Sequence, residues 1–147
     1  MNTIVPLISS GVAGPSGVLH LPRFWQKVSL ESRGKLAAGY PGCGKGSDQM
    51  VLDALGVRKE AAIEYIKSNR PTYPQFEAWI KTQPGVKLDK GTVDKLNGAI
   101  RGYIHDDGTR KEILSESGLS DDGSVLPDAT TLNNLDDWCL FHQTELK

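Results

Sequence analysis

The sequence has little cysteine and almost no excess of charge, and each shortage excludes a class of protein. Two cysteines, Cys43 and Cys139, are too few for the disulfide framework of a small secreted protein. The 17 basic and 18 acidic residues nearly cancel, and no basic run is present. The chain therefore lacks the field that attracts nucleic acid or an anionic membrane. We expect free thiols in the cytoplasm, with neither nucleic acid nor membrane as a partner.

The start of the sequence also lacks the basic region that begins a secretion signal. Residues 1–8 are mildly apolar but are interrupted by Pro6, and a stretch rich in glycine and serine follows from Ser9 to Gly17. We interpret residues 1–18 as a loosely ordered N-terminal arm. A chain of 147 residues has the size of one ordinary domain, so we expect residues 19–147 to form a single helical domain.

Sustained alternation of apolar and polar residues, which marks a half-buried strand, is nearly absent as well. Apolar residues instead recur at spacings of three and four, as they do on one face of a helix. A first helix that begins near Pro22 shows this spacing in Leu21, Phe24, Trp25 and Val28. We predict an all-α fold, a compact bundle of about five to seven short helices with a glycine-rich loop.

Several residues predict where helices begin and end. Gly56 is placed to end a helix in the left-handed conformation. Thr72 and Gln75 have the spacing of a capping box, in which two side chains satisfy the free amides of a first turn. Thr109 and Glu112 repeat that spacing ahead of another helix. These signals predict three of the helix boundaries.

Other expectations rest on apolar spacing and on one further pair of capping residues. A segment that carries Leu36 is expected to remain helical towards Gly39, and Ser47 or Asp48 is expected to cap the helix that follows. The apolar stripe of the longest middle helix runs over residues 93–104. A last helix has a broad face, made of Leu132, Leu135, Trp138, Cys139 and His142, which predicts that the C-terminus docks on the body.

Between two of the expected helices lies the segment Gly39-Tyr40-Pro41-Gly42-Cys43-Gly44-Lys45-Gly46-Ser47-Asp48. Its first seven residues fit the phosphate-binding pattern G-x-x-x-x-G-K. The eighth position needs serine or threonine to hold magnesium, and here it is Gly46. The pattern also requires a strand before the loop, where this sequence predicts a helix. These departures argue against a nucleoside triphosphate site and favour a tight connection between helices.

The same loop carries side chains with useful chemistry. Tyr40 can serve as a hydrogen-bonding acid, Cys43 as a nucleophile, and Lys45 and Asp48 as titratable partners. The amides of a glycine-rich turn before a helix can also bind a small anion or carboxylate. Each side chain has a structural alternative: packing for Tyr40, burial for Cys43, solvation for Lys45 and helix capping for Asp48.

Histidine offers no firm metal site. His105, Asp106 and Asp107 supply three ligands only if the backbone bends to bring them together, and residues of this kind before a glycine are typical of turns and caps. Cys139 and His142 share a helix face, but two ligands do not complete a zinc site. We expect neither a metal nor a cofactor.

The three tryptophans, Trp25, Trp79 and Trp138, are interpreted as core anchors. Any of them left exposed offers a surface for stacking a ligand or docking a partner. Trp25 belongs to the first helix, next to the loop in our interpretation, so we count it among the candidate ligand-binding residues.

Four segments of the chain resemble an uncharacterised bacterial family, domain of unknown function 5069. The segments are Leu21-Pro22-Arg23, the loop from Gly39 to Cys43, the helix from Asp48 to Val57, and Phe76-Glu77-Ala78-Trp79-Ile80. The family's pattern is represented here by Arg23, Tyr40, Cys43, Asp48, Gly56 and Trp79, and the resemblance covers about two-thirds of the chain. It differs in one place, where Gly44-Lys45-Gly46-Ser47 separates the cysteine from the aspartate. The resemblance implies a small α-helical bacterial protein and no established activity.

Two functions of different classes are open on this evidence. In the first, the protein binds a small polar or carboxylate-bearing molecule at the loop, either as a binding protein or as an enzyme that also transforms this molecule. The candidate catalytic residues are Tyr40, Asp48 and Cys43, and the candidate ligand-binding residues are Arg23, Trp25 and Lys45. In the second, the protein is a non-catalytic module that docks on another protein or on a second copy of itself. A concave site rimmed by the loop favours the first function, and a contiguous apolar patch favours the second.

Overall fold

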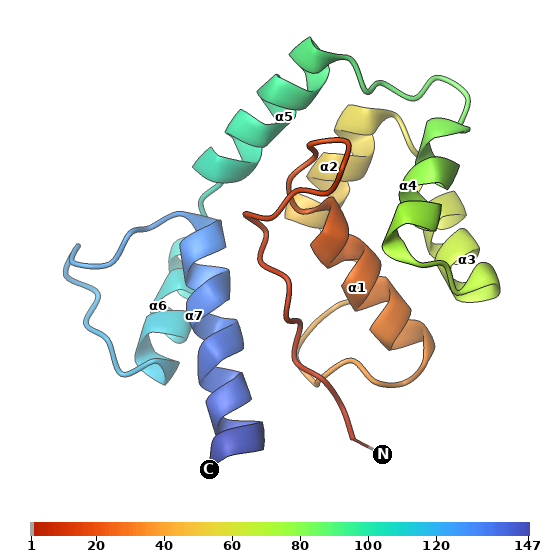
Figure 1. Cartoon of the computed structure of the whole chain (residues 1–147). Helices are drawn as coiled ribbons and strands as arrows, with labels where there is room; N and C mark the ends of the chain where they lie inside the picture. The colour runs from red at the N-terminus through yellow and green to blue at the C-terminus, as the bar shows by residue number, and fades with distance from the viewer. Residues whose placement is uncertain (1) are drawn as a thin grey trace.

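A computed structural model describes residues 2–147, and over this range the fold is all-α (Figure 1). The described residues form seven α-helices and a final π-helical turn, with only isolated β-bridges between extended residues. The elements are α1 (Leu21–Ser32), α2 (Ser47–Leu55), α3 (Lys59–Asn69), α4 (Tyr73–Lys81), α5 (Lys90–Gly102), α6 (Asp107–Glu116), α7 (Ala129–Phe141) and η1 (His142–Leu146). The predicted bundle of five to seven short helices is confirmed.

Local capping explains several of the helix boundaries. At the start of α4 the Thr72 side chain accepts a hydrogen bond from the Gln75 amide, and the Gln75 side chain accepts one from the Thr72 amide. This is the predicted capping box. Gly56 ends α2 with φ of 75°, a left-handed conformation that glycine adopts without strain. Both boundaries follow from the chemistry of a few neighbouring residues.

Three other boundaries differ from the sequence prediction. The segment around Leu36 is not helical: α1 ends at Ser32, Gly34 follows with φ of 67°, and Leu36 forms an isolated bridge with Ile4. Asp106, and not Thr109, caps α6, because its carboxylate accepts a hydrogen bond from the Thr109 amide at 2.7 Å. The helix α5 ends at Gly102, two residues before the predicted end of its stripe at residue 104.

The apolar side chains form two separate clusters. The larger one fills the space between α1, α2, α3, α4 and α5, with Phe24 and Phe76 fully buried at ring centroids 6.0 Å apart. The smaller one lies within the hairpin of α6 and α7 and is centred on Ile113, Leu114 and Leu132. Figure 1 shows α6 and α7 side by side, apart from the bundle and joined to it in the chain by α5. The hairpin therefore has a small core of its own.

The last helix differs from the sequence prediction on its outer face. Leu132 is fully buried, as expected for a docked helix, but Trp138 is 64% exposed and so is not a core anchor. The chain leaves the α-helix at Phe141, and His142 begins the π-helical turn. The helix docks on α6 and α5 while part of its predicted apolar face remains in solvent.

Residues 2–18 make more contacts than the predicted loose arm, and Met1 lies outside the described residues. Val5 and Pro6 are buried, and the Gln26 side chain accepts hydrogen bonds from the amides of Leu7 and Ile8 at 2.8 and 3.1 Å. The segment runs along α1 because that helix presents polar groups on the side away from the core. The arm also contacts two residues of the site described below, because the Ile8 carbonyl oxygen accepts from Arg23 and Ser10 Oγ lies 2.8 Å from His20 Nδ1.

None of the helices in residues 2–147 is both long and apolar enough to cross a lipid bilayer.

Replacing Thr72 with alanine is expected to lower the free energy of unfolding by about 1 kcal/mol, because the first-turn amide of Gln75 loses its acceptor. Thr72 is exposed, so little packing is lost with the side chain. Urea unfolding of Thr72→Ala and Thr72→Ser measures the effect, since serine keeps the capping hydroxyl. Equal stability of the two variants would contradict the role of the capping box.

Candidate functional site

The site begins with two cations on α1, a helix whose other side faces the main core. Arg23 and Lys27 are four residues apart and so lie on one face of the helix. They are only 4% and 6% exposed. Burying such charges is costly unless each finds a counter-charge and hydrogen-bond partners. Two carboxylates, one from α2 and one from α7, meet this need.

Asp48, in the first turn of α2, neutralises Lys27. Its Oδ2 accepts hydrogen bonds from Lys27 Nζ at 2.5 Å and from the Gly44 amide at 2.7 Å, and its Oδ1 lies 2.6 Å from His20 Nε2. Burial alone raises the pKa of Asp48, but the hydrogen bond from His20 and the charge of Lys27 outweigh it and lower the pKa to about 2. Asp48 is therefore ionised at neutral pH.

His20 stands at the N-cap position of α1 in an unusual backbone conformation. Its φ of 71° is left-handed, which costs a non-glycine residue of order 1–3 kcal/mol. Its side chain lies between Asp48 and Ser10, whose Oγ is 2.8 Å from Nδ1. Burial lowers the pKa of His20 despite the hydrogen bond to Asp48, so the ring is neutral at pH 7. The network assigns the proton to Nε2, which donates to Asp48, and Nδ1 accepts from Ser10.

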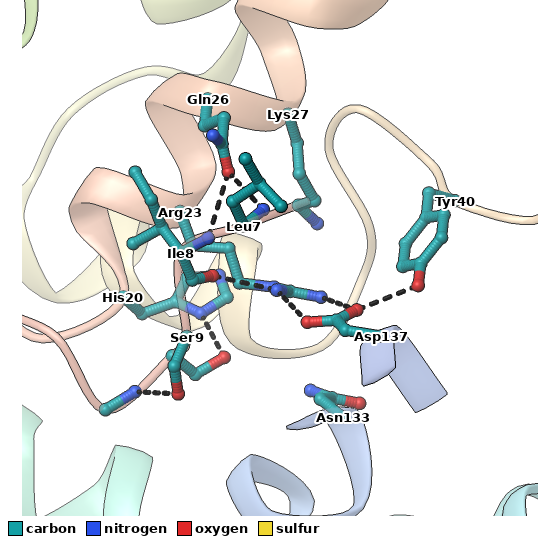
Figure 2. A network of polar contacts seen from close by, with 12 residues as sticks. Leu7, Ile8, Ser9, His20, Arg23, Gln26, Lys27, Tyr40, Asn133 and Asp137 are labelled. Carbon is teal, nitrogen blue, oxygen red and sulfur yellow. Dashed lines mark hydrogen bonds and ion pairs between the residues drawn. The ribbon is translucent and has the colours of Figure 1, made fainter. Parts of the chain in front are cut away.

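Asp137, from α7, neutralises Arg23 (Figure 2). The guanidinium donates from Nη1 to Oδ2 at 2.7 Å and from Nη2 to Oδ1 at 3.1 Å, and Tyr40 Oη donates to Oδ1 at 2.8 Å. Arg23 Nη1 also donates to the carbonyl oxygen of Ile8 at 2.8 Å. Burial and the neighbouring Asp137 raise the pKa of Tyr40, which keeps its hydroxyl protonated. The Arg23–Asp137 pair thus joins α1, the loop, α7 and the N-terminal arm.

His20, Arg23, Lys27, Tyr40 and Asp48 line a cleft of about 830 Å³ between α1 and the glycine-rich loop on one side and the α6–α7 hairpin on the other. Asp137 lies behind this lining, against Arg23 and Tyr40. The first side contributes His20, Arg23, Lys27, Tyr40, Lys45 and Asp48. The second side is acidic and contributes Glu112, Glu116 and Asp136. Burial, and after it the charges of Asp137, Glu116 and Glu112, raise the pKa of Asp136. The cleft therefore has a donor-rich side and an acidic side.

The structure brings four of the six predicted site residues to this cleft. Arg23, Tyr40, Lys45 and Asp48 line it. Asp48 is not the predicted helix cap, because Gly46 occupies the N-cap position of α2 and the Asp48 carboxylate accepts from the Gly44 amide in the loop.

Trp25 and Cys43 do not line the cleft. The Trp25 indole Nε1 donates to the carbonyl oxygen of Pro71 at 3.0 Å, and its ring packs edge-on against Tyr73. These contacts place Trp25 against the start of α4. Trp25 follows Arg23 by two residues, and residues two apart on a helix point to different sides, so Trp25 does not face the cleft with Arg23. Cys43 packs against the main core, and burial raises the pKa of its thiol. A raised pKa disfavours the thiolate that a nucleophile needs.

Sequence reasoning missed His20, Lys27 and Asp137. The sequence did contain a local indication for Lys27. It follows Arg23 by four residues on a predicted helix, so the two side chains share a face. For His20 the indication was weaker, namely its position two residues before Pro22, near the expected start of the helix. The sequence contained no indication for Asp137, because 114 residues separate it from Arg23 and only the docking of α7 brings the two together.

The histidine and acidic residues considered as metal ligands have other partners. His105 Nε2 lies 2.8 Å from the Asn133 side-chain oxygen, and Asp106 caps α6. Cys139 Sγ lies 3.5 Å from Ser117 Oγ. Across residues 2–147, no three or more His, Cys, Asp or Glu side chains are grouped as metal ligands would be.

No protein-family model matches the chain, and no curated protein matches it either. The resemblance to the domain of unknown function 5069 family stays a prediction.

The stability of the protein is expected to fall in acid because Asp48 must be protonated. Its pKa is lower in the folded state, so its contribution is complete above the ordinary value of 3.8 and is lost as the pH falls towards about 2. The shift corresponds to about 2 kcal/mol. Urea unfolding between pH 4 and pH 2 should show a steeper loss for the parent than for Asp48→Asn.

Asp53→Asn is the matched control, because Asp53 lies on the same helix and is exposed. Its pH dependence should follow that of the parent. Parallel curves for the parent and Asp48→Asn would refute the stabilisation of ionised Asp48 by His20 and Lys27.

Proposed function

We propose that the protein binds a small carboxylate-bearing molecule in the cleft between α1, the glycine-rich loop and the α6–α7 hairpin. The observation that supports this most directly is the row of hydrogen-bond donors on the cleft's first side, where Arg23 and Lys27 are buried and Tyr40 is half-buried. Arg23 and Lys27 are charged, and Tyr40 stays neutral and protonated. Charged and hydroxyl donors of this kind suit an ionised carboxylate.

The buried ion pairs themselves support a functional role. Replacing a buried pair with well-packed apolar side chains is often neutral or stabilising, so stability alone does not call for Arg23, Lys27 and their partners. The strained backbone of His20 lies in the same place. Strain and buried charge concentrate at functional sites, because binding needs groups held in position before the ligand arrives.

The charge of the two sides limits the kind of ligand. Asp48 and Asp137 already neutralise Lys27 and Arg23, and Lys45 adds an exposed positive charge at the rim. Glu112, Glu116 and Asp136 face the cleft from the other side and would repel a second negative charge. The favoured ligand therefore has one carboxylate and a neutral or positively charged remainder, and polyphosphates are disfavoured.

Proton transfer to or from the ligand has less support than binding. Both ring nitrogens of His20 are engaged, and the raised pKa of Tyr40 makes its hydroxyl a donor in hydrogen bonds more than an acid. Asp48, with its low pKa, is a weak base. Binding is the function that the geometry favours, and catalysis by Tyr40 or Asp48 is the less favoured form of the proposal. Cys43 has no part in it, because it does not line the cleft.

The test is a thermal-shift screen with amino acids, hydroxy acids and other small carboxylates, followed by calorimetric titration of any compound that raises Tm. Lys45→Met is expected to weaken binding of such a compound about fivefold, because it removes one exposed charge worth about 1 kcal/mol. Lys81→Met is the matched control, since Lys81 is also exposed but lies at the end of α4 and does not line the cleft.

Equal affinity of the two variants would show that the compound binds elsewhere. A broad screen in which no carboxylate raises Tm would count against the proposal.

The second function, self-association or docking on a protein, has one specific observation in its favour. Trp138 is 64% exposed on α7, and Phe141, three residues further on the same face, is 39% exposed. Large aromatic side chains in solvent are typical of interaction surfaces. If α7 pairs with a second copy, sedimentation velocity should show a dimer for the parent and a monomer for Trp138→Ser. A parent that stays monomeric at high concentration would refute self-association through α7.

A further inference from the structure

The contacts of Asp137 have the geometry of a carboxylate-recognition site. Two nitrogens of the Arg23 guanidinium donate to its two oxygens, at 2.7 and 3.1 Å, and the Tyr40 hydroxyl donates to one of them at 2.8 Å. A planar guanidinium recognises any carboxylate in this two-pronged way, whether it belongs to a side chain or to a small molecule. Arg23 is 4% exposed, so its donors are held in place by the protein around them.

The two donors and the carboxylate that they hold come from elements on opposite sides of the cleft. Arg23 and Tyr40 line the cleft from α1 and the loop, whereas Asp137 is supplied by α7 (Figure 2). The cleft therefore gives a small molecule a route to both donors. A ligand carboxylate that reaches them must take the position of Asp137.

The attachment of α7 allows this end of the helix to move. Its start is tied to the bundle, where the Ala129 amide donates to the Tyr103 carbonyl oxygen at 2.8 Å. Asp137 lies about 12 Å further along, at a rise of 1.5 Å per residue. The core of the hairpin, centred on Ile113, Leu114 and Leu132, is separate from the main core. A small rotation about the tied end would withdraw Asp137 without unpacking either cluster.

We propose that Arg23 and Tyr40 form the subsite for the ligand carboxylate, and that Asp137 occupies this subsite in the absence of ligand and is displaced on binding. The inference rests on the proposed function for the class of ligand. It adds which residues hold the carboxylate and how the empty site is kept closed.

The electrostatics of the exchange are favourable. One carboxylate replaces another, so the Arg23 guanidinium is never left buried without a counter-charge, which is the costly state for a buried pair. Asp137 neighbours Asp136, and Glu116 and Glu112 lie on the same side of the cleft. All four carboxylates belong to the α6–α7 hairpin, so a rotation that keeps its cluster packed leaves their mutual repulsion unchanged and does not oppose the exchange.

Chemical rescue tests the subsite directly. In Asp137→Ala both donors, Arg23 and Tyr40, are still present but lose the carboxylate that they share. Formate or acetate is expected to raise the Tm of this variant in a saturable way, by about 4 °C when the anion is at ten times its dissociation constant. Chloride at the same ionic strength should give no saturable rise. The double variant Asp137→Ala/Arg23→Met should not respond to formate.

A formate response no larger than the chloride response would overturn the proposal, and so would an equal response in the double variant. If Asp137→Ala does not fold, the parent provides the second test. Formate and acetate should speed amide hydrogen exchange in the second half of α7, around Trp138, and chloride should not. Exchange that is unchanged in formate up to molar concentration would then overturn the displacement of Asp137.

Failure of this inference is distinguishable from failure of the proposed function. A compound whose affinity depends on Lys45, found together with no rescue by formate, would leave the cleft as a binding site and remove Arg23 and Tyr40 as its carboxylate subsite. If formate rescues the variant but no compound in the screen binds, the carboxylate subsite of Arg23 and Tyr40 is supported and the proposed function of the whole cleft is not.

Discussion

Neutralisation of the two cations on α1 is the constraint on which the rest of the structure depends. One side of this helix carries Phe24 and Val28 into the main core, and an adjacent side carries Arg23 and Lys27 under the cleft. The bundle can close over these charges only if each meets a carboxylate. The helix α2 provides one carboxylate, Asp48, and α7 provides the other, Asp137. The same contacts that allow burial also decide which elements surround the cleft.

This arrangement links binding to stability. A residue that fixes a charge beside the cleft also holds an element of the fold, so its loss leaves a buried partner unpaired, an outcome that typically costs 3–5 kcal/mol. The hairpin of α6 and α7 depends most on its ion pair, Arg23 with Asp137, because its own apolar cluster is small. The bundle of α1 to α5 depends less on the buried ion pairs, since a continuous core holds those helices together.

Local chemistry made much of the fold predictable, and tertiary contacts account for what was not. The capping box at Thr72 and the left-handed Gly56 need only their neighbours in sequence, so both were recognised. The segment at Leu36 was misjudged because its apolar side chain fits a helix as well as the bridge it forms with Ile4. For the site, glycine spacing pointed to the loop. It could not reveal Asp137, which no local pattern connects to the loop.

His20 fixes more than a hydrogen-bond chain, because the left-handed residue sets the point at which α1 starts. Successive residues of a helix are about 100° apart around its axis. Adding one residue between His20 and Arg23 would therefore point the guanidinium and the Lys27 ammonium where Phe24 and Val28 now enter the apolar core. Removing one residue would turn both cations the other way, away from their partners Asp137 and Asp48. Over evolution this short segment should accept changes of side chain far more readily than changes of length. Insertions and deletions among homologous chains are accordingly expected before His20 or beyond the end of α1.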